Sequence, residues 1–168
     1  PELVNRLILS GTLATFDELP AERRQAYLSD RTTPLDAGQT MVELAQRLVP
    51  RLVGPGSLPE GARLAEFSLA GVFPSTYRRA LDAQMRFDRR AALALLQVPT
   101  LLLAGEFDPI ATPERMRAMA AQMPQARCTV LPGVGHWPNL EAPDDFDGAV
   151  LSFLADTAPG LQATGALH

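Results

Sequence analysis

The chain has 168 residues, of which 46% are hydrophobic and 20% are charged, and its formal net charge at pH 7 is −4. This length and composition predict one globular domain, with or without an insertion, and exclude a collagen, a coiled coil or a wholly disordered chain. The negative charge argues against a surface for nucleic acid or anionic lipid. Because no apolar run approaches the roughly 20 residues of a membrane span, we expect a cytoplasmic protein.

The supply of reactive side chains is limited. The chain has 1 Cys and 2 His, which excludes an internal disulfide and a Cys/His zinc site. All 15 basic residues are Arg, so Schiff-base chemistry and a Ser-Lys dyad within this chain are excluded as well.

Three short apolar runs have the length of buried strands and end in turn residues: residues 3–10, 98–105 and 127–131. Such runs, without polar alternation, are typical of a parallel sheet covered on both faces. A helix is predicted to begin at Thr112-Pro113 and a second near Pro143. The buried stripe predicted for the second helix is Phe146, Val150, Phe153 and Leu154. Strands and helices in alternation predict an α/β fold.

The middle of the chain contains no convincing strand and has helical patterns instead. These patterns cover residues 41–52, 59–70, 75–86 and 88–96. We therefore divide the chain into core (1–15), a helical insertion (16–96), core again (97–156) and a flexible tail (157–168).

Two short motifs each follow a predicted strand directly. The first is Gly105-Glu106-Phe107-Asp108-Pro109, and the second is Gly133-Val134-Gly135-His136-Trp137-Pro138. Open α/β sheets bind their ligands at the carboxyl ends of parallel strands, so we expect Asp108 and His136 to meet there. A carboxylate that accepts the Nδ1 proton of a histidine fixes its tautomer and stabilises the imidazolium. The alternative is that Asp108 and His136 are ordinary polar loop residues without a catalytic role.

The stretch VPTLLLAGEFDPIATPERMRAMAAQMPQARCTVLPGVGHWPNLEAPDDF resembles the C-terminal part of the α/β-hydrolase superfamily. That superfamily carries its catalytic acid and histidine after successive strands, in the order Ser, acid, His. The resemblance implies that Asp108 is the acid and that His136 is the general base. It also implies that PELVNRLILSGT is the sixth strand, that residues 16–96 form a cap domain, and that no metal or organic cofactor is needed.

One part of the family pattern is missing from this sequence. None of the six serines lies in a Gly-x-Ser-x-Gly frame, and Ser68 comes nearest, in Phe67-Ser68-Leu69-Ala70-Gly71. We therefore expect a hydrolase of a small ester or lactone whose nucleophile lies outside this chain, so that residues 1–168 alone are inactive. The alternatives are a C–C bond or epoxide hydrolase, or a non-catalytic small-molecule-binding member of the same fold.

In such a sheet the sixth strand pairs with a fifth strand, for which this chain has no sequence. Residues 4–10 would then form an apolar, unpaired edge, which is an aggregation hazard. The predicted partner is the N-terminal half of the same fold or a second copy of this edge, besides a small-molecule substrate. Nucleic acid and membrane are not expected as partners.

Several other residues have both a functional and a structural interpretation. Trp137 is a candidate substrate-binding residue that lines the pocket mouth, or it packs the loop. Glu106 and Asp17 are alternative acids, ranked below Asp108. Cys128 is expected to be a small buried hydrophobe. Some apolar residues of the insertion face a substrate cleft or hold its helices together, namely Phe67, Phe73, Tyr77, Met85 and Phe87. Four arginines form a solvated face or include a carboxylate anchor, namely Arg78, Arg79, Arg89 and Arg90.

Overall fold

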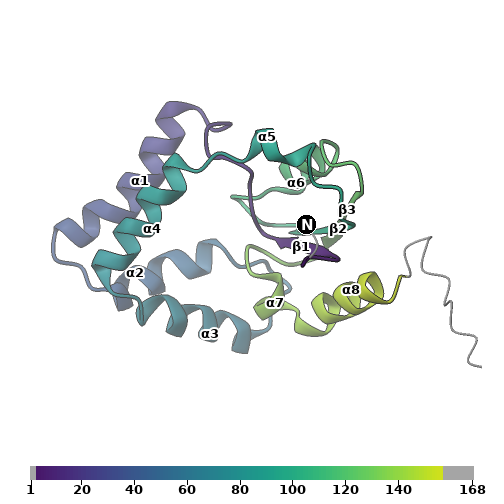
Figure 1. The fold of residues 1–168 in the computed structure, drawn as a ribbon. Coiled ribbons are helices and arrows are strands. Elements are labelled where there is room, and N and C mark those ends of the chain that lie inside the picture. Colours follow the sequence, from purple (N-terminus) through teal and green to yellow (C-terminus); the bar gives the residue numbers. More distant parts are fainter. Residues whose placement is uncertain (1–2, 157–168) are drawn as a thin grey trace, which may run out of the picture.

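The computed structural model describes residues 3–156 and has a three-stranded parallel sheet (Figure 1). The strands are β1 (Leu7–Ser10), β2 (Thr100–Gly105) and β3 (Ala126–Leu131), in the order β1-β2-β3. Leu7 pairs with Thr100, and Thr100 pairs with Ala126, so the amino ends of all three strands lie side by side. The predicted α/β fold with a parallel sheet is confirmed. The tail predicted for residues 157–168 lies outside the described residues.

The first strand is shorter than the predicted run over residues 3–10. It begins at Leu7, whose amide donates to the Pro99 carbonyl at 3.0 Å, and Leu3 is 98% exposed. Residues 3–6 have no neighbouring strand because β2 starts only at Thr100. Within residues 3–156, β1 pairs with β2 alone. Its four residues are half-buried, unlike the fully buried β2.

Helices cover both faces of β2, as the lack of polar alternation predicts. On one face, Leu102 and Ala104 pack with α6 (Pro113–Ala120) through Met116 and Met119. On the other face, Leu101 and Leu103 pack with α8 (Pro143–Ala155). The predicted starts of both helices are confirmed, and the Thr112 side chain caps α6. The predicted stripe of α8 is confirmed for Phe146, Val150 and Phe153 and wrong for Leu154, which is 46% exposed.

Five α-helices lie between β1 and β2 in the sequence. They are α1 (Ala21–Asp36), α2 (Met41–Leu48), α3 (Pro59–Ala70), α4 (Pro74–Arg86) and α5 (Arg90–Leu93), with a 3-10 turn over Val49–Arg51. The predicted patterns over 41–52, 59–70 and 75–86 are confirmed as helical. The stretch 88–96 is helical only over α5, because Asp88 is extended in an antiparallel bridge with Thr15. The first helix, α1, was not predicted.

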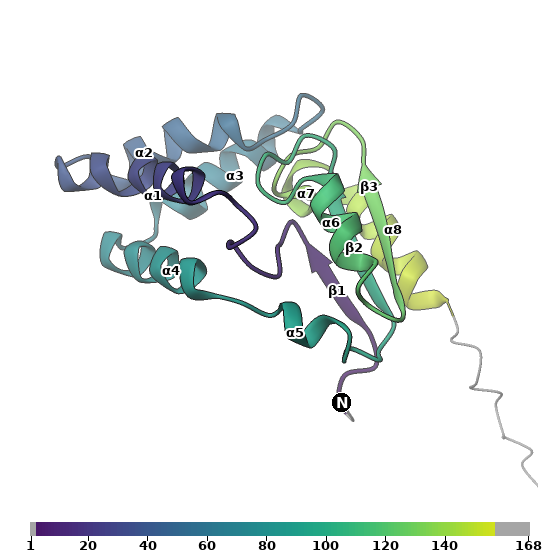
Figure 2. The same ribbon diagram turned by 90° about the horizontal axis from the view of Figure 1, so that it is seen from above.

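The helices α1–α4 lie together beyond the carboxyl ends of the strands (Figures 1 and 2). Their apolar side chains form a cluster around Leu44 and Leu48, against which Ile110 and Trp137 from the sheet side pack. Trp137 is the residue before the short helix α7 (Pro138–Glu141). The insertion is thus in contact with the loops that follow β2 and β3. No helix within residues 3–156 has the length and apolarity required to cross a membrane.

Candidate active site

Asp108 lies in the turn that follows β2, and its side chain is fully buried. The amides of Ile110 and Ala111 donate to its Oδ1 at 2.7 and 3.0 Å. These two bonds fix the carboxylate at the start of the segment that leads into α6. They also leave Oδ2 available for another donor.

His136 supplies that donor from the loop after β3. Its Nδ1 lies 2.8 Å from Asp108 Oδ2, and its side chain is 20% exposed. Because an ionised carboxylate only accepts, Nδ1 is the donor of this hydrogen bond, and in the neutral imidazole Nε2 then carries the lone pair. The predicted contact between Asp108 and His136 at the carboxyl ends of the strands is therefore present. Chemically, the arrangement can take up a proton at Nε2 and stabilise the resulting charge.

The His136 loop is tightly joined to the helical insertion. The His136 amide donates to the Leu52 carbonyl at 2.7 Å. A Cβ at Gly135 would lie 2.1 Å from the same carbonyl oxygen, so only glycine permits this approach. Gly133 has φ +72°, a second reason for glycine in the loop.

A buried carboxylate that the sequence analysis did not single out holds this loop. Glu141, the last residue of α7, is 1% exposed. Its Oε2 accepts from the Gly54 and Gly135 amides at 2.8 and 2.7 Å and from the Ser57 hydroxyl, and its Oε1 accepts from the Trp137 amide at 2.8 Å. The Glu141 carboxylate therefore binds the residues directly before and after His136, and it links them to Gly54 and Ser57 of the insertion. Its position three residues after Pro138 gave no pattern that could reveal this role.

His136 opens into a cavity of about 300 Å³ between the sheet and the insertion. Trp137 lines the same cavity, and its ring centre lies 5.5 Å from that of His136. Tyr77 lines it too, whereas Phe67 and Phe73 are each 77% exposed. Phe87 borders a smaller space of about 110 Å³ that also touches His136. Trp137 thus lines the cavity and also packs against the Leu44 cluster.

The alternative acids do not contact His136. Glu106 is exposed, and its Oε2 accepts from the Gly133 amide at 2.8 Å. Asp17 forms ion pairs with Arg24 and Arg90. Ser68 is an exposed residue of α3. Cys128 is partly buried against the Met116 cluster, and this burial raises the pKa of its thiol.

The four arginines named as possible anchors do not line the His136 cavity. Arg78 pairs with Asp36, and Arg90 pairs with Asp88. An arginine that the sequence analysis missed, Arg31 of α1, lines the His136 cavity instead. Within residues 3–156, no three His, Cys, Asp or Glu side chains are arranged to hold a metal ion.

Comparison with known proteins places this geometry in a family. The family described as "Alpha/beta hydrolase family" matches residues 3–149. The chain belongs to the alpha/beta hydrolase family. The fold class and the resemblance inferred from the sequence are thereby confirmed.

Among similar proteins is the 3-oxoadipate enol-lactonase 2 of Acinetobacter baylyi, which is 26% identical over 89% of this chain and 54% of its own length. The polyketide synthase ThaQ of Burkholderia thailandensis is 38% identical over 51% of this chain, which corresponds to 4% of that protein. A malate-bound esterase from Thermogutta terrifontis is a similar solved structure, with a TM-score of 0.74, 30% identity, and coverage of 89% of this chain and 55% of that chain. This alpha/beta hydrolase chain thus spans about half the length, or less, of these relatives.

Proposed function

We propose that this chain carries the acid and the base of a serine-type hydrolase that acts on small esters or lactones. The observation that supports this most directly is the 2.8 Å contact between His136 Nδ1 and the fully buried Asp108 Oδ2. It is the geometry by which a carboxylate orients a catalytic histidine. The similarity to an enol-lactonase and to an esterase favours acyl chemistry over the other reactions of the fold.

In the proposed mechanism, His136 Nε2 takes the proton of a serine hydroxyl as that oxygen attacks the substrate carbonyl. The imidazolium then gives the proton to the leaving oxygen, and an acyl-enzyme forms. Water, activated by the same nitrogen, hydrolyses this ester in the second half of the reaction. Asp108 stabilises the imidazolium in both halves. The nucleophile and the oxyanion donors lie outside residues 1–168.

We further propose that residues 16–96 act as a cap over the site, and that the strand next to the nucleophile pairs with the open edge of β1. The amides of Leu7 and Gly11 donate toward β2, at Pro99 and Leu103. Strand alternation then directs the amides of Ile8 and Ser10 to the other edge. In the full-length protein these two amides are expected to exchange slowly with deuterium. Fast exchange would contradict the pairing.

The test of the chemistry is His136→Ala in the full-length protein. We expect kcat for a small ester to fall by at least about 10³-fold, because the proton acceptor is removed. The melting temperature is expected to fall as well, because the buried Asp108 Oδ2 loses its partner, so kcat is compared at a temperature at which the variant is folded. Asn139→Ala, at an exposed position of the neighbouring helix α7, is the matched control. Turnover close to that of the wild type in His136→Ala would refute the proposal.

A further inference from the structure

A buried cation lies in the same cavity as His136. The Arg31 side chain is only 9% exposed, and its guanidinium carbon stands 3.5 Å from the centre of the Tyr27 ring. Its Nη1 donates to the main-chain oxygen of Tyr27 at 3.1 Å. Burial of a charge is costly unless a partner replaces its lost hydration, so the partners of Arg31 decide what this residue is for.

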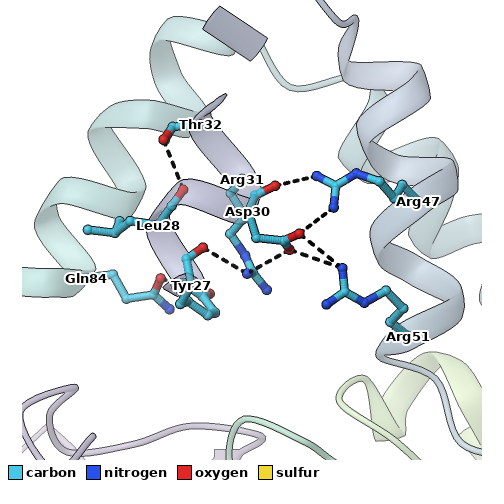
Figure 3. A network of polar contacts seen from close by, with 8 residues as sticks. All are labelled: Tyr27, Leu28, Asp30, Arg31, Thr32, Arg47, Arg51 and Gln84. Carbon is cyan, nitrogen blue, oxygen red and sulfur yellow. Dashed lines mark hydrogen bonds and ion pairs between the residues drawn. The ribbon is translucent and has the colours of Figure 1, made fainter. Parts of the chain in front are cut away.

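The nearest carboxylate is shared with two other arginines. Asp30 Oδ2 lies 3.6 Å from Arg31 Nη1, while Asp30 also pairs with Arg47 at 2.7 Å and with Arg51 at 3.2 Å (Figure 3). Burial by itself raises the pKa of Asp30, but hydrogen bonds and charge from Arg47 and Arg51 outweigh it and lower the pKa overall. One ionised carboxylate therefore faces three guanidinium groups, and among the described residues Arg31 has no carboxylate of its own.

Two adjoining cavities meet at Arg31. The cavity of about 300 Å³ is bounded by His136 and, of the described residues that line it, Arg31 is the one with a permanent charge. A second cavity of about 480 Å³ shares five lining residues with the first, namely Tyr27, Arg31, Leu48, Leu52 and Ile110. Its lining adds Arg23, Arg51 and Arg115 but only one carboxylate, that of Asp30. Both spaces therefore favour an anionic group at Arg31.

Two tyrosines line the same cavity as the guanidinium. Tyr27 and Tyr77 both line the His136 cavity. Burial raises the pKa of each phenol above its ordinary value, although the Arg31 charge opposes this effect. Both phenols stay protonated at neutral pH, and the Tyr27 hydroxyl donates to the Gln84 side-chain oxygen at 3.3 Å. Between them and His136 the lining is largely apolar, with Leu48, Leu52 and Ile110 among its members.

We infer that Arg31 is the anchor for a carboxylate group of the substrate, so that the enzyme acts on esters or lactones that carry a second, free carboxylate. A planar carboxylate accepts two parallel N–H bonds from a guanidinium, which makes this pairing both strong and directional. The apolar walls suit a short hydrocarbon chain between the anchored carboxylate and the carbonyl at His136. This inference rests on the proposed function, since the reacting end of the substrate is assigned to His136.

The experiment compares acidic and neutral esters of equal chain length in the full-length protein. The substrates are the mono-ethyl esters of glutaric and adipic acid, and ethyl valerate and ethyl hexanoate. We expect Arg31→Met to raise KM for the acidic esters about 10- to 100-fold and to leave the neutral esters within about twofold. Arg86→Met removes an arginine whose side chain is 75% exposed and is expected to alter neither class. Equal changes for both classes, or no change, would overturn the inference.

Two measurements on the wild type keep the inference falsifiable if Arg31→Met does not fold. The acidic esters are expected to have the higher kcat/KM, and adipate is expected to inhibit competitively where hexanoate does not.

If no ester is hydrolysed, calorimetric titration separates the two proposals. Adipate binding that Arg31→Met abolishes supports the anchor while the hydrolase proposal fails. Turnover of neutral esters without adipate binding overturns the anchor and leaves the hydrolase.

Discussion

The two polar clusters that border the cavity are built in different ways. The Asp108 carboxylate is fully buried, and each of its oxygens is matched, Oδ1 by two main-chain amides and Oδ2 by His136. In the cluster around Arg31, flexible side chains share the Asp30 carboxylate, and their exposure reaches 60% at Arg51. Main-chain donors fix a group with little freedom to move, whereas arginines around one acid can rearrange when an anion enters. The first construction suits proton transfer, and the second suits recognition.

The largest effect is expected from a substitution of Asp108 in the first cluster. Asp108→Asn keeps the shape but places an amide beside Nδ1, which favours the wrong tautomer of His136. We expect kcat to fall about 10⁴-fold, measured as ester hydrolysis by the full-length protein.

The matched control for this variant is Glu106→Gln, two residues away. Its carboxylate accepts from the Gly133 amide and does not touch His136. We expect kcat to stay within about twofold, because a glutamine at this exposed position can still accept from the Gly133 amide. Similar losses in the two variants would remove the distinction between a catalytic acid and a loop acid.

The second prediction concerns the carboxylate that holds the His136 loop. Glu141→Gln replaces an acceptor by an amide whose NH₂ group must face at least one of the Gly54, Gly135 and Trp137 amides. We expect the free energy of unfolding to fall by about 2–3 kcal/mol, measured by urea denaturation. Glu114→Gln, whose side chain is 78% exposed, is expected to change it by less than about 0.5 kcal/mol. An equal effect of both would mean that the buried bonds add nothing.

The difference between the clusters also explains what the sequence could predict. Asp108 and His136 follow strands that local apolar patterns reveal, and the order of parallel strands alone brings their loops to one edge. The start of α6 at Thr112 has a local cause too, the cap and the proline that follows it. The predicted meeting of acid and base needed no knowledge of distant contacts.

Helix α1 has no comparable local pattern, because its sequence AERRQAYLSDRTTPLD is polar on most sides and contains Pro34. Its two buried residues are Arg31 and Leu35. Arg31 is covered by the Tyr27 ring one turn earlier in α1, but its burial in the cavity also depends on α4, which contributes Tyr77. The donors to Glu141 likewise come from two segments about 80 residues apart, at Gly54 and Gly135. A single sequence shows neither.

The third prediction compares a buried glycine of the His136 loop with an exposed glycine of α8. Gly135→Ala would place a Cβ 2.1 Å from the Leu52 carbonyl oxygen, where the loop and the insertion are in contact. We expect a loss of about 1–3 kcal/mol in unfolding free energy, together with lower kcat, because His136 is the next residue. Gly148→Ala lies within α8 and meets nothing within 4 Å. A gain of about 0.5–1 kcal/mol is expected there. A Gly135→Ala variant as stable and active as the wild type would show that the contact is loose.

The smallest effect is expected from the arginine cluster and depends on pH. The pKa of Asp30 is lowered in the folded protein, so its carboxylate binds protons more weakly there than in the unfolded chain. Its contribution to stability is therefore present above the ordinary pKa of 3.8 and is lost as the pH falls through the lowered value. Because Asp30 is partly exposed, we expect Asp30→Asn to cost less than about 1 kcal/mol at pH 7. Urea denaturation at pH 7 and near pH 3 should show this cost shrinking at the lower pH, with Asp82→Asn as the exposed single-pair control. A cost that grows toward low pH would mean that the cluster is held together by something other than the Asp30 charge.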